Sequence, residues 1–390
     1  MIKRIGMLTS GGDCQALNAT MRGVVKGLTN SIDDLEVYGF DDGYKGLIYG
    51  KYRMLTAKDF SGILTQGGTI LGTSRQPFKL MRVPDEKGLD KVEAMKQTYY
   101  KLCLDCLVIL GGNGTQKTAN LLREEGLNII HLPKTIDNDL VHTDHTPGFG
   151  SAARYVASTV REITLDANVY EKKSVTIVEI MGRHAGWLTA ASALARKYTG
   201  DNPLLIYLPE TAFDTEEFLK KTEACFEKNC NVVVCVSEGI HDNKGTFICE
   251  YDNSVGTDTF GHKMLAGCGK YLENLVRSRL GVKARSIELN VSQRCSASML
   301  SDTDRQEAIT AGIFGVQAAL KGETGKMVSF IRQETSKGVY QMRCGLEDVN
   351  EICNEEKTVP LSWISQDGSD VTEDFIHYAR PLIQGNVELP

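Results

Sequence analysis

Short apolar runs alternate with longer amphipathic stretches along the whole chain. Several runs, such as CLVIL and NVVVCV, lack any alternation of apolar and polar residues, which is typical of parallel strands covered on both faces. The runs predict strands at Ile5–Thr9, Leu35–Phe40, Cys106–Leu110, Asn128–Leu132, Ser174–Ile180, Pro203–Leu208, Asn231–Val236, Arg285–Leu289 and Met327–Arg332. The stretches between them predict helices at Ala16–Leu28, Thr115–Glu125, Ser151–Asp166, Trp187–Lys197, Thr215–Lys228 and Lys263–Arg279. This order predicts right-handed βαβ units in a doubly wound α/β fold.

Glycines gather directly after predicted strands, in the loops Ser10–Asp13 and Gly111–Thr115. Ligands of open parallel sheets bind at the carboxyl ends of the strands, so these loops are candidate binding loops. Glycine lets backbone N–H groups approach a phosphate, and the following helix N-terminus favours negative charge. Either loop alone is explained equally well as a tight turn. Neither has the Lys-Ser/Thr ending of a Walker A loop, and no dinucleotide fingerprint follows the first strand.

Polar residues crowd the segment Pro133–Asp139, just after the apolar run NIIHL. In an extended stretch Asp137 and Asp139 would point to the same side. One carboxylate could then accept a proton from an attacking hydroxyl while the other supports a hydrated magnesium ion, and Lys134 could offset phosphate charge. The alternative is a capped turn with surface carboxylates.

Three further strand ends have charged residues. Arg183, among glycines after Ser174–Ile180, could clamp a phosphate, and Glu238 could bind sugar hydroxyls. Gln293 and Arg294 follow another strand. Each alone is more readily structural, but together they suggest one binding region at the strand ends.

Cysteine and histidine spacing does not indicate a metal site. The eleven cysteines show no framework spacing and are expected to be mostly buried thiols, while Cys14 in the first glycine loop is a candidate reactive thiol. Cys103 and Cys106 lack a second pair. His142 and His145 lie on a Thr/Asp-rich loop without a third ligand, which favours a hydrogen-bonded loop.

Length and charge narrow the class of protein. The 390 residues suit two domains, and the net charge of −6 gives no basic surface for nucleic acid or membranes. We find no membrane-spanning run and no signal peptide, so we expect a soluble cytoplasmic enzyme with small-molecule substrates.

The motifs GGDCQALN, GTSRQ, GGNGT, PKTIDNDL, TPGFGSA, EIMGRHAGW, VSEGI and QRCSAS occur here in the order found in 6-phosphofructokinases. The chain therefore resembles this superfamily over nearly its whole length. The resemblance implies Mg²⁺-dependent transfer of a phosphoryl group to the 1-hydroxyl of fructose 6-phosphate, giving fructose 1,6-bisphosphate.

The resemblance also implies roles for residues that match its motifs. Asp137 would be the catalytic base, with Lys134, Thr135, Asp139 and Arg183 as the other catalytic residues. The phosphoryl donor would be held by Gly12, Arg75, Gly112, Asn113, Gly114 and Thr115. The sugar phosphate would be held by Thr135, Asp137, Met181, Gly182, Arg183, Glu238, Arg285 and Arg294. Asn113 and Asp139 would hold the metal ion, mostly through water.

The superfamily contains ATP-dependent and pyrophosphate-dependent branches. TDHTPGFGSAARY through MGRHAGWLTAASALA resembles the pyrophosphate branch, in which the position of Gly114 is typically Asp. Glycine there removes bulk and negative charge, so a nucleotide could fit. Lys134 is typical of pyrophosphate users but also accompanies glycine in some ATP users. We therefore expect ATP as the donor, with pyrophosphate as the alternative.

Three positions depart from the pattern of the bacterial ATP enzymes. Asn113 replaces a magnesium-associated Asp, Ser174 replaces an arginine offered across a subunit contact, and Val291 replaces a His or Tyr. These departures leave open another phospho-sugar, such as sedoheptulose 7-phosphate. They also leave open a catalytically weak regulatory subunit that binds nucleotide or sugar phosphate.

We accordingly expect two Rossmann-like domains with mainly parallel sheets and the active site in the cleft between them. The donor domain would comprise residues 1–149 plus about 293–325. The sugar-phosphate domain would comprise 150–292 plus about 326–390. The stretch Pro84–Lys96 would be a solvated helix face or linker, and the protein a homodimer or homotetramer.

Overall fold

The computed structural model describes residues 3–251, 267–335, 338–352 and 355–385. The chain forms two compact units, each built from two separate stretches. Unit 1 comprises Met1–Ser151 and Arg294–Glu356, and unit 2 comprises Ala152–Gln293 and Lys357–Pro390.

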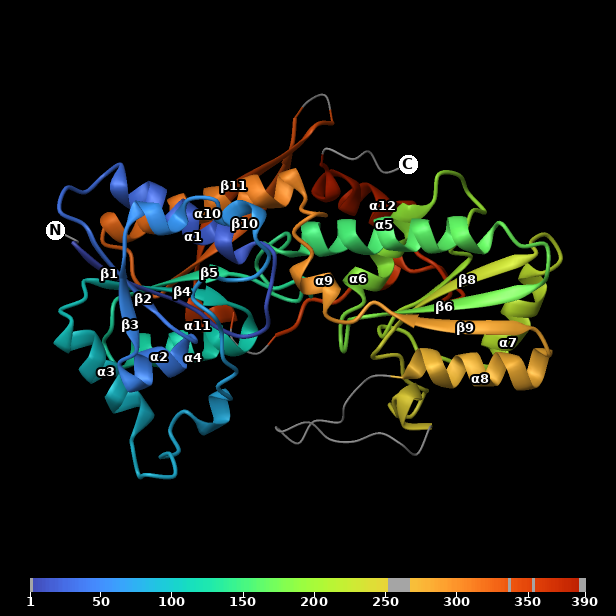
Figure 1. Ribbon diagram of the computed structural model, residues 1–390, viewed down its shortest axis with the longest axis horizontal. Helices are drawn as coiled ribbons and strands as arrows, with labels where there is room; N and C mark the ends of the chain where they lie inside the picture. The colour runs from blue at the N-terminus through green and yellow to red at the C-terminus, as the bar shows by residue number, and fades with distance from the viewer. Residues whose placement is uncertain (1–2, 252–266, 336–337, 353–354, 386–390) are drawn as a thin grey trace. The chain divides into compact units, whose positions relative to one another are not determined.

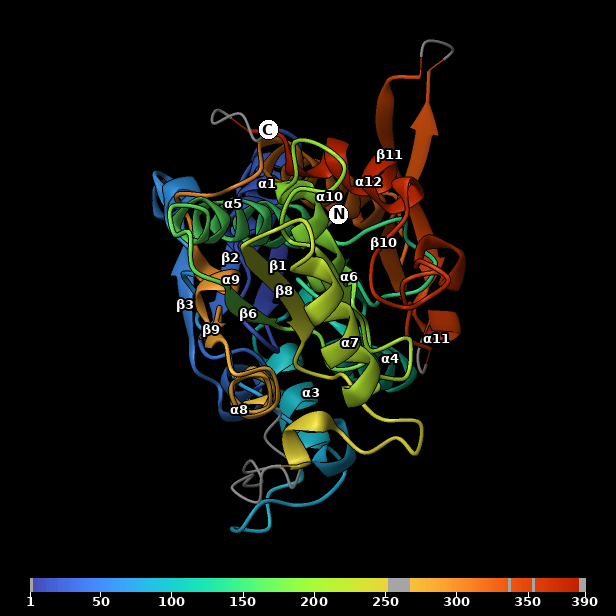
Figure 2. The same ribbon diagram turned by 90° about the vertical axis from the view of Figure 1, so that its right-hand side faces the viewer.

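Unit 1 contains a seven-stranded sheet in the order β11-β10-β5-β4-β1-β2-β3. Its strands are β1 Arg4–Thr9, β2 Glu36–Phe40, β3 Tyr52–Leu55, β4 Cys106–Gly111, β5 Ile129–Pro133, β10 Lys326–Glu334 and β11 Tyr340–Asp348. The five inner strands run parallel, whereas β3 and β11 are antiparallel edge strands. Figure 2 shows the hairpin that β11 forms with β10. Every residue of β4 is buried, which explains why its sequence shows no alternation.

Helices cover both faces of this sheet. Figure 1 shows α1 and α10 on one face, with α2, α3 and α4 on the other. The helices of this unit are α1 Leu17–Thr29, α2 Tyr44–Tyr49, α3 Lys91–Lys101, α4 Asn113–Glu124, α10 Asp302–Leu320 and α11 Val349–Ile352, with 3₁₀ turns at Ala57–Phe60, Ile63–Thr65 and Phe78–Leu80. A core of apolar side chains, including Phe40, Met95 and Leu107, fills the space against the sheet.

Helices α1 and α10 approach so closely that glycine is needed at their contact. A Cβ atom on Gly312 would lie 2.3 Å from the carbonyl oxygen of Thr20, and one on Gly23 would lie 2.2 Å from that of Ile309. Real Cβ atoms do not approach so closely, so the two helices pack backbone against backbone here.

Unit 2 contains a four-stranded sheet in the order β7-β8-β6-β9, with all neighbours parallel. Helices α5 and α8 lie on opposite faces of it (Figure 1). The strands are β6 Ser174–Ile180, β7 Leu205–Tyr207, β8 Asn231–Ser237 and β9 Lys283–Glu288. The helices are α5 Phe149–Ala167, α6 Trp187–Ala190, α7 Thr215–Cys225, α8 Cys268–Leu280, α9 Ser292–Cys295 and α12 Glu373–Ala379. Helix α5 begins in unit 1, and α9 ends in it. The 3₁₀ turns lie at Ala191–Ala195, Ile248–Tyr251, Leu361–Trp363 and Arg380–Ile383.

The second stretch of unit 2 packs onto the first through an aromatic cluster. The ring of Trp187 lies 6.1 Å from that of Trp363, 6.3 Å from that of Phe375 and 5.3 Å from that of Tyr378. The Trp187 indole also donates to the carbonyl of Lys357 over 2.9 Å. Trp363, Phe375 and Tyr378 therefore attach the described residues 357–385 to this unit.

The predicted α/β fold with mainly parallel sheets is confirmed, and each predicted strand is present within a few residues of its expected bounds. The edge strands β3 and β11 and the helix α10 were not predicted. Of the two alternatives predicted for Pro84–Lys96, the helix is confirmed from Lys91 onward, where α3 begins, although Val92, Ala94 and Met95 of this helix are buried and not solvated. The predicted helix Lys263–Arg279 begins at Cys268, and residues 263–266 lie outside the described residues.

The predicted domain composition is wrong for residues 326–356. They were expected in the second domain, but β10 pairs with β5 and β11 pairs with β10, which makes both strands part of the first sheet. The chain therefore returns to unit 2 near residue 357 instead of residue 326.

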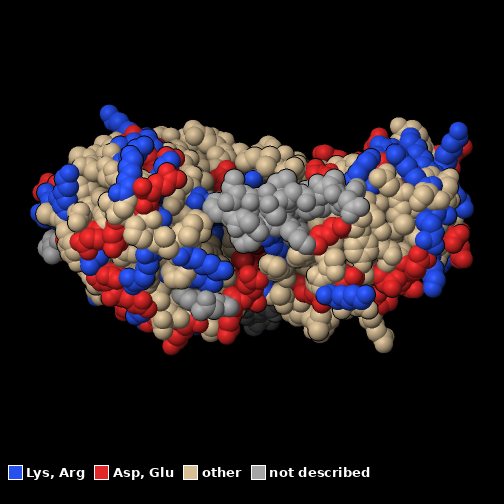
Figure 3. All heavy atoms as spheres, turned by 90° about the horizontal axis from the view of Figure 1, so that it is seen from below, with Lys and Arg blue, Asp and Glu red and all other residues tan. Residues whose placement is uncertain are grey.

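Positive and negative side chains are interspersed over the face drawn in Figure 3, where its described residues show no broad patch of one sign. Among the helices that the structure describes, none is long and apolar enough to cross a lipid bilayer.

Candidate active site

Three neighbouring parallel strands of unit 1 end in the loops that the sequence singled out. Where these strands end, the Ser10 amide donates to the carbonyl of Leu110 over 2.9 Å, and the Lys134 amide donates to that of Gly111 over 3.0 Å. A Cβ atom on Gly11 would lie 3.5 Å from both Lys134 Nζ and Thr115 Oγ1. The two glycine loops and the segment after β5 thus form one group of side chains.

The glycines of these loops have distinct roles. Gly11 has a φ of 91°, a conformation that favours glycine. Gly112 is the residue before α4, whose first backbone N–H groups have no partner within the helix. A Cβ atom on Gly114 would have no heavy atom within 4 Å. The space beside residue 114 is therefore open.

Lys134 is buried and donates a hydrogen bond to the carbonyl of Gly12. Burial lowers the pKa of its ammonium group, while the negative charges of Asp137 and Asp13 oppose that effect. A cation next to backbone N–H groups makes this place suitable for phosphate.

Asp137 follows in the same loop, with its side chain exposed. Thr135 Oγ1 lies 3.3 Å from Asp137 Oδ2 and accepts from the Asp137 amide over 3.1 Å. Surrounding protein displaces water from the carboxyl group and raises its pKa, against the positive charges of Lys134, Arg294 and Arg75. These neighbouring positive charges favour the ionised form of the carboxylate, which is the form that can accept a proton.

The segment between Asp137 and Asp139 is not extended, contrary to the assumption made from the sequence. Asn138 between them has a φ of 55°, in the left-handed region. Asp137 is exposed, whereas Asp139 is half-buried. The alternation expected of an extended strand therefore does not apply to these two carboxylates.

Oxygen ligands suitable for magnesium lie in the same group of loops. Asn113 Oδ1 and Asp13 Oδ1 are buried and have no hydrogen-bond partner among the described residues. Oxygen atoms of this kind are the ligands that Mg²⁺ prefers. The described residues contain no cluster of three or more His, Cys, Asp or Glu side chains placed to hold a metal ion. Water and donor phosphates would therefore complete the coordination of an ion bound here.

Asp13, at the end of the first glycine loop, is a candidate metal ligand that the sequence did not identify. Its signal in the sequence was a carboxylate directly after two glycines. Cys14, the next residue, is fully buried, and burial raises the pKa of its thiol to about 12. The expectation of a reactive thiol there is wrong, because only the thiolate is a good nucleophile.

The expectation of mostly buried thiols holds only in part for the other cysteines: Cys106, Cys235, Cys249 and Cys268 are buried. All ten cysteines for which the structure gives a state are free thiols, and Cys103, Cys230 and Cys295 are exposed.

Unit 2 brings a second group together at the ends of β6 and β8. The Glu238 amide donates to the carbonyl of Ile180 over 2.9 Å, and the Gly239 amide donates to that of Gly182 over 3.2 Å. Ser237 Oγ also donates to the Gly182 carbonyl, a contact that the sequence did not indicate. Met181, Gly182, Arg183 and Glu238 therefore lie in neighbouring loops.

Arg285 does not join this group. It lies within β9 opposite Thr176, four residues before the end of β6 at Ile180, which is about 13 Å along a strand. Its guanidinium group lies 3.2 Å from the carboxylate of Asp166 on α5. Within one chain, Arg285 is thus separate from the other predicted sugar-phosphate residues.

The predicted residues other than Met181, Gly182, Arg183, Glu238 and Arg285 belong to unit 1. Unit 1 holds Gly12, Arg75, Gly112, Asn113, Gly114, Thr115, Lys134, Thr135, Asp137, Asp139 and Arg294. In this group, a Cβ atom on Gly12 would lie 3.8 Å from Arg294 Nη1. The functions of these residues, and a single site that joins both groups, stay predictions.

Comparisons with known proteins agree with the resemblance in the motifs. The phosphofructokinase family model matches residues 4–319. The chain is 34% identical to a pyrophosphate–fructose 6-phosphate 1-phosphotransferase of Rhodospirillum rubrum, over 97% of this chain and 94% of the relative. It is 38% identical to an ATP-dependent 6-phosphofructokinase of Spirochaeta thermophila, over 92% of this chain and 93% of the relative.

Solved structures give the same result for the fold. The crystal structure of a pyrophosphate-dependent phosphofructokinase from Marinobacter aquaeolei matches with a TM-score of 0.85 and 28% identity, and the match covers 100% of this chain and 93% of that chain. Relatives named for either phosphoryl donor are thus similar to this sequence. The protein belongs to the phosphofructokinase family.

Proposed function

We propose that the protein is an ATP-dependent 6-phosphofructokinase, which transfers the γ-phosphoryl group of ATP to the 1-hydroxyl of fructose 6-phosphate. The observation that carries this proposal is the grouping of Lys134, Thr135 and Asp137 with the two glycine loops at the ends of β1, β4 and β5. Phosphoryl transfer requires donors and cations for the phosphates and a carboxylate for the attacking hydroxyl.

In the proposed reaction, the ionised Asp137 accepts the proton of the sugar 1-hydroxyl. The hydroxyl oxygen forms a bond to the γ-phosphorus, and the bond from that phosphorus to the β,γ-bridging oxygen breaks, so that ADP leaves. The proton passes from Asp137 to solvent. Lys134 and the backbone N–H groups of the glycine loops offset the charge that spreads over the phosphate oxygens.

Magnesium, when bound, neutralises charge on the donor phosphates. Asn113 and Asp139, through water, would hold it, and Asp13 supplies a further carboxylate. Arg183 and Glu238 would bind the sugar phosphate.

Pyrophosphate is the second candidate donor. The similarity to the Rhodospirillum rubrum transferase and the presence of Lys134 favour it. The open space beside Gly114 favours ATP, because no side chain there opposes a longer, more highly charged donor.

The test is the rate of fructose 1,6-bisphosphate formation from fructose 6-phosphate and Mg²⁺ with ATP, GTP or pyrophosphate. We expect kcat/KM to be highest with ATP. Higher kcat/KM with pyrophosphate would overturn the choice of donor, while binding of both substrates without any product would indicate a regulatory subunit.

Asp137→Ser tests the catalytic base. Loss of a general base typically lowers kcat by about 10²–10⁴-fold, and we expect little change in KM, because the phosphate-binding groups remain. Asp33→Ser, at an exposed carboxylate of the same unit, is the matched control and should leave kcat unchanged. Near-normal turnover of folded Asp137→Ser would contradict the proposed mechanism.

A further inference from the structure

The loop that contains Asp137 runs from Lys134 to Gly148, and its two ends are held together. Thr135 pairs with Gly148 in an isolated parallel bridge, and Thr146 Oγ1 donates to the carbonyl of Thr135 over 2.8 Å. The position of Asp137 therefore depends on what holds the returning half of this loop.

Asn138 links the two halves directly. It is fully buried, its φ is 55°, and its Oδ1 accepts from the Thr146 amide over 3.1 Å. Asparagine adopts this backbone conformation more readily than most residues. The residue after Asp137 is thus hydrogen-bonded to the residue after His145.

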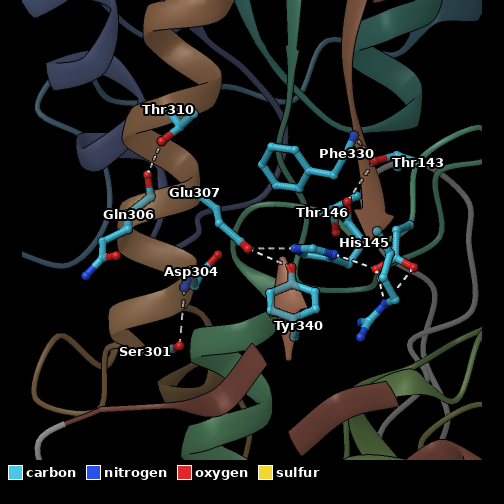
Figure 4. Close-up of polar contacts among 12 residues, drawn as sticks. Thr143, His145, Thr146, Ser301, Asp304, Gln306, Glu307, Thr310, Phe330 and Tyr340 are labelled. Carbon is cyan, nitrogen blue, oxygen red and sulfur yellow. Dashed lines mark hydrogen bonds and ion pairs between the residues drawn. The ribbon is translucent and has the colours of Figure 1, made fainter. Parts of the chain in front are cut away.

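His145 is buried between two carboxylates. Its Nδ1 lies 2.8 Å from Asp144 Oδ2, and its Nε2 lies 2.7 Å from Glu307 Oε2 on α10 (Figure 4). An ionised carboxylate can only accept, so both ring nitrogens donate when both acids are ionised, and the ring is then an imidazolium. The ring of Phe330 on β10 lies 4.9 Å from it.

Both carboxylates have a further donor from the β10–β11 hairpin. Arg332 Nε lies 3.0 and 3.1 Å from the two oxygens of Asp144. The Tyr340 hydroxyl donates to Glu307 Oε1 over 2.6 Å, as Figure 4 shows. Asp304 on α10 and Cys344 on β11 are the other titratable groups that act on this cluster.

The charges of the cluster favour a protonated His145. Burial lowers its pKa, but the hydrogen bonds to Asp144 and Glu307 outweigh burial and raise the pKa above its ordinary value. For Asp144, burial raises the pKa, while His145 and Arg332 outweigh it and lower the pKa to about 2. The raised pKa favours the imidazolium, which is lost as the pH rises through that pKa.

Other contacts already attach the loop to the rest of unit 1. The Gly148 amide donates to Asp304 over 2.8 Å, and the Phe330 amide donates to Thr143 Oγ1 over 2.8 Å. A buried ion pair adds little net stability compared with apolar packing, because desolvation offsets its attraction. Its directional hydrogen bonds do fix geometry, which indicates positioning as the role of His145.

We propose that His145, held by Glu307 and Asp144, is a positioning residue that sets the place of Asp137 through the Asn138–Thr146 hydrogen bond. This inference rests on the proposed function, since it presupposes that Asp137 is the catalytic base.

Glu307→Gln tests the inference, because it keeps the size of the side chain and removes its charge. We expect kcat to fall by about ten-fold near neutral pH, since small displacements of a catalytic group cost that much or more, with both KM values changed less than about two-fold. The loss of one negative neighbour should also move the alkaline decline of kcat to lower pH by about one unit. A purely structural role would lower the stability without moving the pH profile of the folded enzyme.

Glu323→Gln is the matched control, because it makes the same chemical change at an exposed carboxylate after α10. It should leave kcat and the pH profile unchanged. Tyr340→Phe keeps the aromatic ring and removes the hydrogen bond that partly offsets the charge of Glu307. It should lower kcat by less than Glu307→Gln does and move the alkaline decline of kcat to higher pH, opposite to the shift in Glu307→Gln. If Glu307→Gln fails to fold, Tyr340→Phe decides the question.

Asp137→Ser in the same assays separates the two proposals. If it retains turnover, the proposed function fails. If it is inactive while folded Glu307→Gln or Tyr340→Phe has the kcat and pH profile of the unaltered enzyme, only the positioning role of His145 is overturned.

Discussion

Under the proposed function, residue 114 is the position at which a single side chain would decide between the two candidate donors. A Cβ atom there has open space around it, so a substitution can be accommodated without displacing the glycine loop. Gly114 also lacks a positive φ, so a side chain at this position would not strain the backbone. The effect of a side chain at this place therefore reports on the donor and not on folding.

Gly114→Asp should damage ATP use far more than pyrophosphate use. A carboxylate close to a nucleotide phosphate costs about 2–3 kcal/mol in a partly solvated site, so we expect kcat/KM for ATP to fall by about 10²-fold. Gly114→Ala adds the Cβ atom without the charge and is the matched control. Coupled assays with both donors measure the effect, and equal losses in the two variants would refute the charge argument.

The sequence identifies residues that lie next to apolar strands and misses those that depend on distant parts of the chain. Lys134 and Asp137 could be predicted because they directly follow a buried run. The hydrogen bond between His145 and Glu307 could not be predicted, because 162 positions separate the two residues in the sequence. The extended conformation assumed around Asp137 failed at Asn138, where a side-chain hydrogen bond supports a left-handed backbone.

At the scale of elements, the contact between α1 and α10 depends on small residues. The glycines and alanines of α10 that allow this contact also weaken the apolar periodicity by which a helix is recognised, so α10 was missed. The edge strands β3 and β11 were missed for another reason: β3 is largely exposed and β11 mostly half-buried, so neither forms a continuous apolar run.

Gly312→Ala should destabilise unit 1. The added methyl group would overlap the backbone of α1, and forcing extra atoms into a packed contact typically costs about 1–3 kcal/mol. Urea unfolding followed by far-ultraviolet circular dichroism measures the change. Thr310→Ala, at an exposed position on the same helix, should change stability by less than about 0.5 kcal/mol. A Gly312→Ala protein as stable as this control would show that the helices can separate without cost.

At the scale of the whole molecule, tryptophan fluorescence distinguishes unit 2 from unit 1. Both tryptophans of the chain, Trp187 and Trp363, belong to unit 2 and pack together there. The division into two doubly wound units was within reach of the sequence. The assignment of β10 and β11 was not, because pairing with β5 depends on contacts between distant segments.

Tryptophan emission should therefore report the unfolding of unit 2 alone. In Gly312→Ala, we expect the circular dichroism transition to begin at lower urea while the emission midpoint stays near that of the unaltered protein, since domains with their own cores can unfold separately. Thr310→Ala should leave both transitions in place. Equal shifts of the two signals in Gly312→Ala would instead mean that the chain unfolds as one cooperative body.

The passage of the chain from unit 1 to unit 2 and back has a consequence for biosynthesis. When Ser151 leaves the ribosome, the first unit still lacks α10 against α1 and β10 against β5. At synthesis rates of about 5–20 residues per second, these partners arrive roughly ten to forty seconds later. During that interval a sheet edge and a helix face stay uncovered on the nascent chain, so the newborn protein should depend on chaperones that shield them.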